Sequence, residues 1–83
     1  MESRPKRMGT ISIIVEKREA QAKLVNDLLS EHADIILARM GLPFKDRGVS
    51  VIALIIEATT DEVGALTGKL GRLEHVRVKS SLI

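Results

Sequence analysis

The most apolar stretch of the chain lies just past its middle and predicts a buried strand over residues 48–58. From Val49 to Ala58, only Ser50 and Glu57 interrupt the apolar residues. The stretch is too short to span a membrane, and its many β-branched residues favour a strand over a helix. Successive apolar positions indicate burial on both faces of a sheet. One face would carry Ile52, Leu54 and Ile56, and the other Val51, Ala53 and Ile55.

The first half of the chain changes its hydrophobic period twice. Residues 9–16 alternate apolar and polar side chains, which is typical of a strand. Residues 17–31 carry apolar side chains at helical spacing and predict an amphipathic helix. Residues 33–41 alternate again and predict a second strand, and residues 41–48, with two glycines and a proline, predict a hairpin loop. The apolar positions of the helix are Ala20, Leu24, Val25, Leu28 and Leu29.

The second half predicts a helix followed by a strand. Thr59 and Glu62 have the spacing of a capping box, with which helices begin. Glycines at positions 64, 68 and 71 interrupt this helix, so either another backbone approaches it closely or it is short and weakly propagated. Residues 76–83 predict an edge strand with Arg77 and Lys79 facing outward. The apolar stripe of the helix is Val63, Leu66, Leu70 and Leu73.

This order, β-α-β-β-α-β, predicts an α+β fold of the ferredoxin-like sandwich type. Residues 9–83 would form one domain, and residues 1–8 a flexible basic tail. Two helices would cover one face of a four-stranded antiparallel sheet, whose first and third strands lie in the middle. The other face is too apolar to remain in water, so we expect a homodimer or homotetramer. The expected interface residues are Ile14, Ile35, Leu37, Val51, Ala53 and Ile55.

The composition of the chain argues against several classes of site and function. A chain of 83 residues buries only about 60–65% of its unfolded surface, so it gains stability from association. The absence of cysteine excludes disulfides and thiolate metal sites. A net charge of +2 and a single aromatic residue, Phe44, argue against a nucleic-acid surface on the folded part. No segment reads as a secretory signal or a membrane span, so we expect a cytoplasmic protein.

Candidate catalytic and metal groups are few. His32 and His75 are too few for a metal site, which needs three or four ligands, unless an oligomer interface completes one. Glu16 and Glu57 end the two central strands and would meet if those strands were parallel, as an acid–base pair or, more commonly, as salt-bridged strand ends. Phosphate-loop and Ser-His-Asp motifs are absent. The sequence predicts no enzyme, no metal and no cofactor.

Basic residues near the first helix and the hairpin loop are the candidate ligand-binding groups. A guanidinium beside Gly48 could hold a phosphate or carboxylate, although a solvated turn is the plainer account. The set comprises Lys17, Arg18, Arg39, Lys45 and Arg47. A ligand would then lie at a subunit interface, near the start of the first helix or the loop at residues 41–48.

Two stretches resemble ACT-type regulatory domains. The first is ISIIVE at residues 11–16, followed by a helix, and the second is LIIE at residues 54–57, followed by a helix and LEHVRVKS at residues 73–80. Amino-acid-binding ACT domains place a Pro-Gly turn after the first strand, where this chain has KREA at residues 17–20. This departure argues against amino-acid sensing.

Residues 9–82 also resemble a small family of regulators proposed for the iron-only hydrogenase system. The most specific segments are RMGLPFKDRG at residues 39–48, TTDE at residues 59–62 and LTGKLG at residues 66–71. The resemblance implies an ACT-like fold, akin to the ligand domain of the nickel-responsive ribbon-helix-helix repressor, and a role in transcription regulation. Because eight residues before Gly9 cannot supply a ribbon-helix-helix reader, DNA contact would need the tail or a partner.

The sequence thus predicts a regulatory module that senses a small molecule or mediates oligomerisation. The first alternative is a ligand-free protein–protein interaction module. The second is a small enzyme of the dimeric ferredoxin-like kind.

Overall fold

The computed structural model describes residues 5–83, apart from the side chain of Arg18. Within this part of the chain the elements follow in the predicted order, with a 3-10 turn on either side of the second strand. The strands are β1 (Arg7–Glu16), β2 (Ile36–Phe44), β3 (Val49–Ala58) and β4 (Val76–Leu82). The helices are α1 (Arg18–Glu31) and α2 (Thr60–Gly71), and the 3-10 turns are Ala33–Ile35 and Lys45–Arg47.

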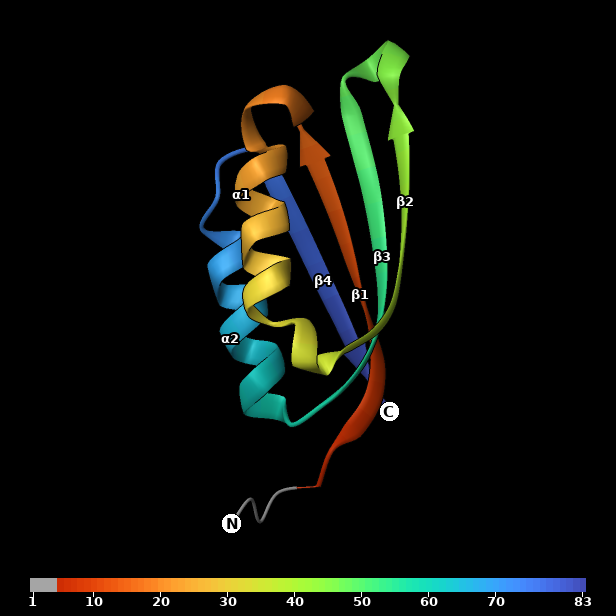
Figure 1. Ribbon diagram of the computed structural model, residues 1–83, viewed down its shortest axis with the longest axis vertical. Coiled ribbons are helices and arrows are strands. Elements are labelled where there is room, and N and C mark those ends of the chain that lie inside the picture. Colours follow the sequence, from red (N-terminus) through yellow and green to blue (C-terminus); the bar gives the residue numbers. More distant parts are fainter. Residues whose placement is uncertain (1–4) are drawn as a thin grey trace.

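The strands form one sheet in the order β2-β3-β1-β4, and each neighbouring pair is antiparallel. Both helices lie on one face of this sheet, and no described element covers the other face (Figure 1). The predicted ferredoxin-like sandwich is therefore confirmed, with β1 and β3 in the middle and β4 at one edge. We call the uncovered side of the sheet the open face.

The core lies between the sheet and the two helices. Alternate side chains of β1 and β3 point into it, as the period of two in a strand requires. Apolar residues from α1, α2, the first 3-10 turn and β4 complete it. The buried members are Ile11, Ile13, Val15, Val25, Leu29, Ile35, Ile52, Leu54, Ile56, Ala58, Val63, Leu66, Leu70 and Val76.

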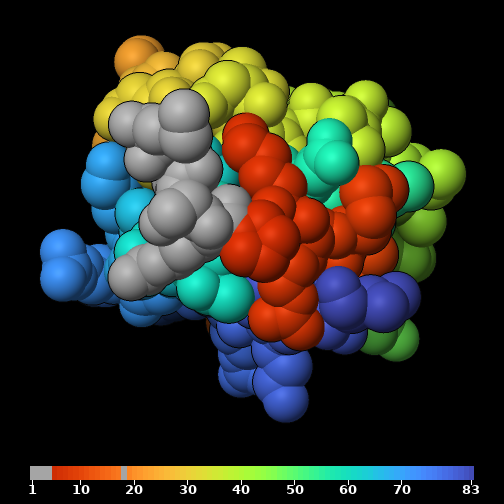
Figure 2. Space-filling model, turned by 90° about the horizontal axis from the view of Figure 1, so that it is seen from below, coloured from red at the N-terminus to blue at the C-terminus, as the bar shows by residue number. Residues whose placement is uncertain are grey.

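The two ends of the described chain lie side by side. The backbone N–H of Ile83 donates to the carbonyl oxygen of Met8 at 2.9 Å. Figure 2 shows the dark blue C-terminal residues against the red start of β1. The tail expected over residues 1–8 is therefore too long, because Arg7 and Met8 pair with other strands, and its residues 1–4 lie outside the described part.

Helix α2 begins at the predicted capping box. The Thr59 hydroxyl accepts a hydrogen bond from the Glu62 N–H at 3.1 Å, and the Thr59 N–H donates to the Glu62 carboxylate at 2.8 Å. Of the three glycines, Gly64 and Gly68 have nothing within 4 Å of the place where a Cβ would sit. No described backbone of this chain therefore approaches the helix closely at these two positions.

Helix α1 is rotated relative to its predicted stripe. Val25 and Leu29 are buried, whereas Ala20 and Leu24 are exposed. The sequence offers apolar residues on two adjacent lines of the helix, and only one line can face the sheet. Gln21 lies on the buried line, and its Oε1 atom is buried with no hydrogen-bond partner among the described residues.

The start of β2 departs from the prediction. Ile35 belongs to a 3-10 turn and is buried in the core, so it is not part of the open face. The pairing of β2 with β3 shifts between Ile36 and Ala38, which leaves Leu37 as a bulge residue. A bulge inserts one residue and reverses the alternation beyond it. The predicted faces of this strand are therefore exchanged from Ala38 onward.

The end of β2 also departs from the prediction. The strand continues to Phe44 through the segment that was expected to be a loop, and the connection to β3 is only residues 45–48. Pro43 fits because β2 is an edge strand, where a missing N–H costs no ladder bond. Gly48 closes the hairpin with a φ of 66°, a conformation that glycine adopts without strain.

Candidate functional site

The predicted basic residues fall into separate places. Lys17 and Lys45 line one hollow of about 600 Å³ between the start of α1 and the β2–β3 hairpin. Arg39 lines another pocket, and Arg47 lies at the tip of the hairpin. Arg18 is the first residue of α1, and its side chain lies outside the description. Among the members of this set whose side chains are described, the structure brings only Lys17 and Lys45 together.

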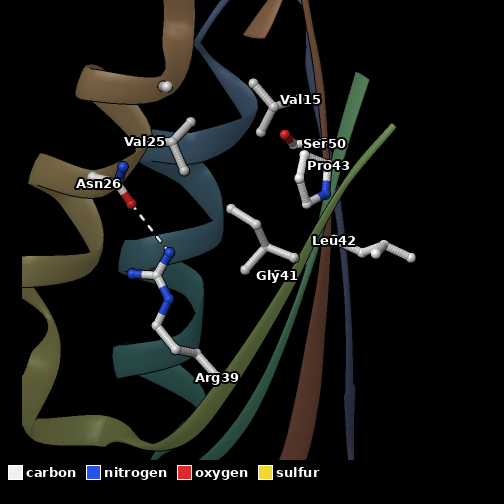
Figure 3. A pocket seen from close by; sticks show the side chains of 10 residues that line it. Val15, Val25, Asn26, Arg39, Gly41, Leu42, Pro43 and Ser50 are labelled. Atoms are coloured by element: carbon white, nitrogen blue, oxygen red, sulfur yellow. Dashed lines mark hydrogen bonds between the residues drawn. The ribbon is translucent and has the colours of Figure 1, made fainter. Parts of the chain in front are cut away.

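The pocket that contains Arg39 lies between α1 and the β2–β3 half of the sheet, and we call it the helix–edge pocket. Its volume is about 240 Å³. Figure 3 shows Arg39 and Asn26 on one side of it, and Val15, Ser50 and Pro43 on the other. Its lining residues are Val15, Ala22, Val25, Asn26, Arg39, Gly41, Leu42, Pro43, Ser50 and Ile52.

A hydrogen bond defines the polar side of the helix–edge pocket. The Arg39 guanidinium, from β2, donates to Oδ1 of Asn26, on α1, at 3.1 Å. Asn26 and Ser50 were not predicted as site residues. Ser50 carried a signal, since it is a lone polar residue near the start of an apolar strand. Asn26 carried no such signal in the sequence, because a polar residue on a helix usually faces water.

The two glutamates do not form a site. Because β1 and β3 are antiparallel, Glu16 pairs with Val49 while Glu57 pairs with Met8. The two carboxylates therefore lie at opposite ends of the central strands, and the possibility that they meet is wrong. Glu16 instead approaches Arg77, with 3.9 Å between Oε1 and Nε.

The histidines lie apart and have ordinary surface neighbours. Nε2 of His32 is 3.4 Å from the Lys69 ammonium, and Nε2 of His75 is 3.9 Å from the Glu74 carboxylate. No group of three potential metal ligands occurs among the described residues. Nor is any helix within residues 5–83 long and apolar enough to cross a membrane.

The carboxylate of Glu62, in the cap of α2, has a shifted pKa. The pKa of Glu62 lies below its ordinary value, chiefly because the backbone N–H of Thr59 donates to the carboxylate. Partial burial opposes this effect, while the Lys6 ammonium at 3.9 Å and the Thr59 side chain reinforce it. The hydrogen bonds that lower this pKa stabilise the start of α2. The shift is therefore no indication of an acid–base site.

The open face changes in character from one edge to the other. Rows of paired residues cross the sheet, such as Leu42, Val51 and Ile14, followed by Arg77 on β4. The β2–β3 half is apolar, whereas the β4 edge is basic and polar. The apolar members are Met8, Ile14, Ala38, Met40, Leu42, Phe44, Val49, Val51, Ala53 and Ile55. Met40 is 74% exposed and Ile55 is 49% exposed, which is high for apolar side chains.

Of the six residues predicted for a subunit interface, the structure places four on the open face. These are Ile14, Val51, Ala53 and Ile55, and their role in an interface stays a prediction. Leu37 is exposed at the bulge, and Ile35 lies in the core. The prediction missed Met40, Leu42 and Phe44. Leu42 and Phe44 were assigned to a loop, and the bulge turns Met40 to the face opposite the predicted one.

Solved structures share this fold. The uncharacterized protein TM1266 from Thermotoga maritima is 38% identical, with a TM-score of 0.90, over 94% of this chain and 98% of that one. The ACT domain from GTP pyrophosphokinase of Chlorobium tepidum is 19% identical, with a TM-score of 0.77, over 92% and 99%. The nitrogen regulatory PII-like protein CPII from Thiomonas intermedia K12 is 18% identical, with a TM-score of 0.53, over 93% and 94%.

The family assignment rests on the sequence as well as on the fold. No curated protein matches the chain. The model of the TM1266-like family matches residues 7–80, nearly the whole chain, and its description reads "Iron-only hydrogenase system regulator, putative". The ACT-like fold expected from the resemblance is confirmed by the ACT-domain structure. The chain therefore belongs to the TM1266-like family of regulators assigned to the iron-only hydrogenase system.

Proposed function

We propose that this protein is a homo-oligomeric regulatory module in transcription control, whose subunits associate through the open face and whose effector is a small anion. The observation that carries the proposal is the apolar β2–β3 half of the open face, which no described part of the chain covers. Such a contiguous apolar surface marks an interaction site more often than a free surface.

A second copy of the chain is the partner that fits best. A standard interface takes about 800 Å² from each partner, which is about one-seventh of the 5678 Å² that this chain exposes. A two-fold axis would place apolar half against apolar half. The basic β4 edges would then remain at the rim, where charges are solvated.

Basic side chains near the two pockets favour an anionic effector. Lys17 and Lys45 line the hollow at the start of α1, and Arg39 lines the helix–edge pocket. The structure of the PII-like protein CPII contains ADP, AMP and bicarbonate. That relative supports the proposal only as an example of this fold with anions bound.

The assembly is tested by sedimentation of the purified protein at about 10 μM, a concentration well above the Kd of a stable complex. We expect a dimer or tetramer, and a shift to monomer in Met40→Glu and Ile55→Glu. The matched control is Leu24→Glu, because Leu24 is 47% exposed but lies on α1. A folded wild-type monomer, or dissociation by the control alone, contradicts the proposal.

The alternative is a ligand-free interaction module. Thermal unfolding in the presence of amino acids, nucleotides, organic acids and divalent metals distinguishes the two. A ligand specific for the native state at a hundred times its Kd stabilises it by about 2.7 kcal/mol. Oligomers with no stabilising compound would favour the interaction module.

DNA contact is tested by salt-dependent gel shifts. The truncation must end before Lys6, because Lys6 pairs with Glu62 and Arg7 begins β1. Binding that falls steeply with salt would show phosphate contacts. Equal binding by the full and truncated chains would assign it to the folded domain and not to the tail.

A further inference from the structure

Among its described lining residues, the helix–edge pocket combines an apolar floor with one cationic side chain. Its floor is formed by Val15, Val25 and Ile52, which are almost completely buried. Arg39 and Asn26 are exposed, and they lie across the pocket from Val15 and Pro43 (Figure 3). Small-molecule sites have this composition, in which apolar walls surround a few polar groups that fix the orientation of the ligand.

Arg39 is positioned but not neutralised. Its guanidinium donates a hydrogen bond to Asn26, and no carboxylate of the described side chains lies within ion-pair distance of it. A guanidinium has five N–H donors in a planar fork that matches the two oxygens of a carboxylate. The bond to Asn26 holds one edge of the fork and leaves donors for a ligand.

Gly41 supplies an independent indication that the pocket is kept open. It lies on the helix side of β2, opposite Ile52, in the middle of a strand where glycine is unfavourable. A Cβ at Gly41 would meet nothing within 4 Å, and its backbone needs no left-handed conformation. Neither packing nor geometry of the described chain therefore requires glycine here, but a larger side chain would occupy the pocket.

The lining residues also argue against ligands that carry an ammonium group. It contains no aspartate or glutamate, so a buried ammonium group would have no charged partner. The volume of about 240 Å³ equals that of roughly eight water molecules in the liquid. A short branched aliphatic acid fits these limits, whereas the corresponding amino acid would bury its ammonium group without a charged partner.

We propose that the helix–edge pocket binds a small aliphatic carboxylate without an amino group, such as a branched 2-oxo acid, with Arg39 as the carboxylate anchor and Val15, Val25 and Ile52 as the aliphatic site. This inference rests on the proposed function only in that the bound acid would be the effector. It assigns the ligand to the helix side of the sheet, away from the open face.

The test is a titration of the intact protein with 2-oxoisovalerate. Calorimetry and amide chemical shifts monitor the binding. Valine and isobutanol are the comparison compounds. Valine carries an ammonium group in place of the 2-oxo group, and isobutanol lacks the carboxylate. We expect 2-oxoisovalerate to bind at least about tenfold more tightly than isobutanol, the factor for one charge-assisted hydrogen bond, and also more tightly than valine, whose ammonium group would be buried without a charged partner. Shifted amides should lie on α1 and β2.

Two variants and one control locate the site. Arg39→Gln removes the anchor and Gly41→Val fills the pocket, and each should weaken binding by at least about tenfold. Arg72→Gln removes an arginine from the C-terminal end of α2, outside the pocket lining, and should leave binding unchanged. Circular dichroism verifies that each variant is folded, and Gly41→Val favours the strand because valine is β-branched.

The inference is overturned if no titrant binds at millimolar concentration, if valine binds as tightly as the oxo acid, or if Arg39→Gln binds like the wild type. Sedimentation of the same samples separates this result from the proposed assembly. Oligomers without binding reject only the pocket, and monomers that bind the oxo acid reject only the open-face interface.

Discussion

The backbone N–H of Glu16 donates a 2.7 Å hydrogen bond to the carbonyl oxygen of His75. The bond joins the end of β1 to the turn that leads into β4. His75 has a φ of 65°, and Lys17, which follows Glu16, has a φ of 52°. Two residues that carry a Cβ thus hold the left-handed conformation at the same end of the sheet. This conformation is unfavourable for L-residues, so the turn stores a small strain.

Glycine at position 75 should relieve that strain. A left-handed residue with a Cβ costs about 1–2 kcal/mol, while glycine loses about 0.5–1 kcal/mol more entropy on folding. We therefore expect His75→Gly to leave the free energy of unfolding unchanged or to raise it by up to about 1 kcal/mol. His75→Val should lower it, because β-branched residues resist this conformation. Urea unfolding of the three proteins measures the difference, and a destabilised glycine variant would show that the imidazole itself stabilises the turn.

Gly9 should not tolerate even alanine. A Cβ at Gly9 would overlap the carbonyl oxygen of Ser81 and lie 2.7 Å from Cδ2 of Leu82. Because the obstacle is the backbone of β4, relief requires the strands to move apart, and overpacking of this kind costs roughly 1–3 kcal/mol. Gly41→Ala is the matched control, since that strand position is open. Equal stability of the two variants in denaturant unfolding would contradict the tight β1–β4 contact.

Gly68 should behave in the opposite way. It lies on an exposed part of α2 with open space around it. Alanine is favoured over glycine inside a helix by up to about 1 kcal/mol, so Gly68→Ala should raise the free energy of unfolding by that amount. Thermal unfolding measures the gain, and sedimentation reports on assembly. If the variant dissociated the oligomer, a neighbouring subunit would approach α2 closely, as one of the two explanations for the glycines requires.

Glu62 should make stability depend on pH in mildly acidic solution. Its pKa is lower in the folded state than in the unfolded chain, so the unfolded chain binds the proton more readily. The stabilisation is therefore present above the ordinary glutamate pKa and is lost as the pH falls through the lower folded value. Between about pH 5 and about pH 3 the wild type should lose more stability than Glu62→Gln, which keeps the capping hydrogen bonds.

A control variant and a null outcome complete this experiment. Glu74→Gln removes one negative charge from an exposed position outside any helix cap and should follow the wild type. Identical pH profiles for Glu62→Gln and the wild type would show that the cap hydrogen bonds do not depend on the charge of Glu62.

The elements that the sequence predicts well are those with local causes. The apolar, β-branched run of β3 favours a strand over a helix, and the spacing of Thr59 and Glu62 closes a capping box within four residues. The alternation of Ile11, Ile13 and Val15 faces the core as predicted. Each of these signals acts between residues close in the chain, so it can be recognised without knowing the distant contacts.

The errors share a different cause. The bulge at Leu37, the extension of β2 to Phe44 and the rotation of α1 all depend on contacts between residues distant in the sequence. The candidate site depends on the same contacts. Arg39 was noticed as a basic residue, but its meeting with Asn26 required the bulge to turn it toward α1.

The sequence by itself determined the number, type and order of the elements, because hydrophobic period, capping and turn residues act along the chain. Tertiary structure alone decided which side of β2 faces water, which line of α1 faces the sheet, and where a pocket remains between them. The physical reason is that a shift of one residue in a strand exchanges its two faces, and only pairing with β3 fixes that register.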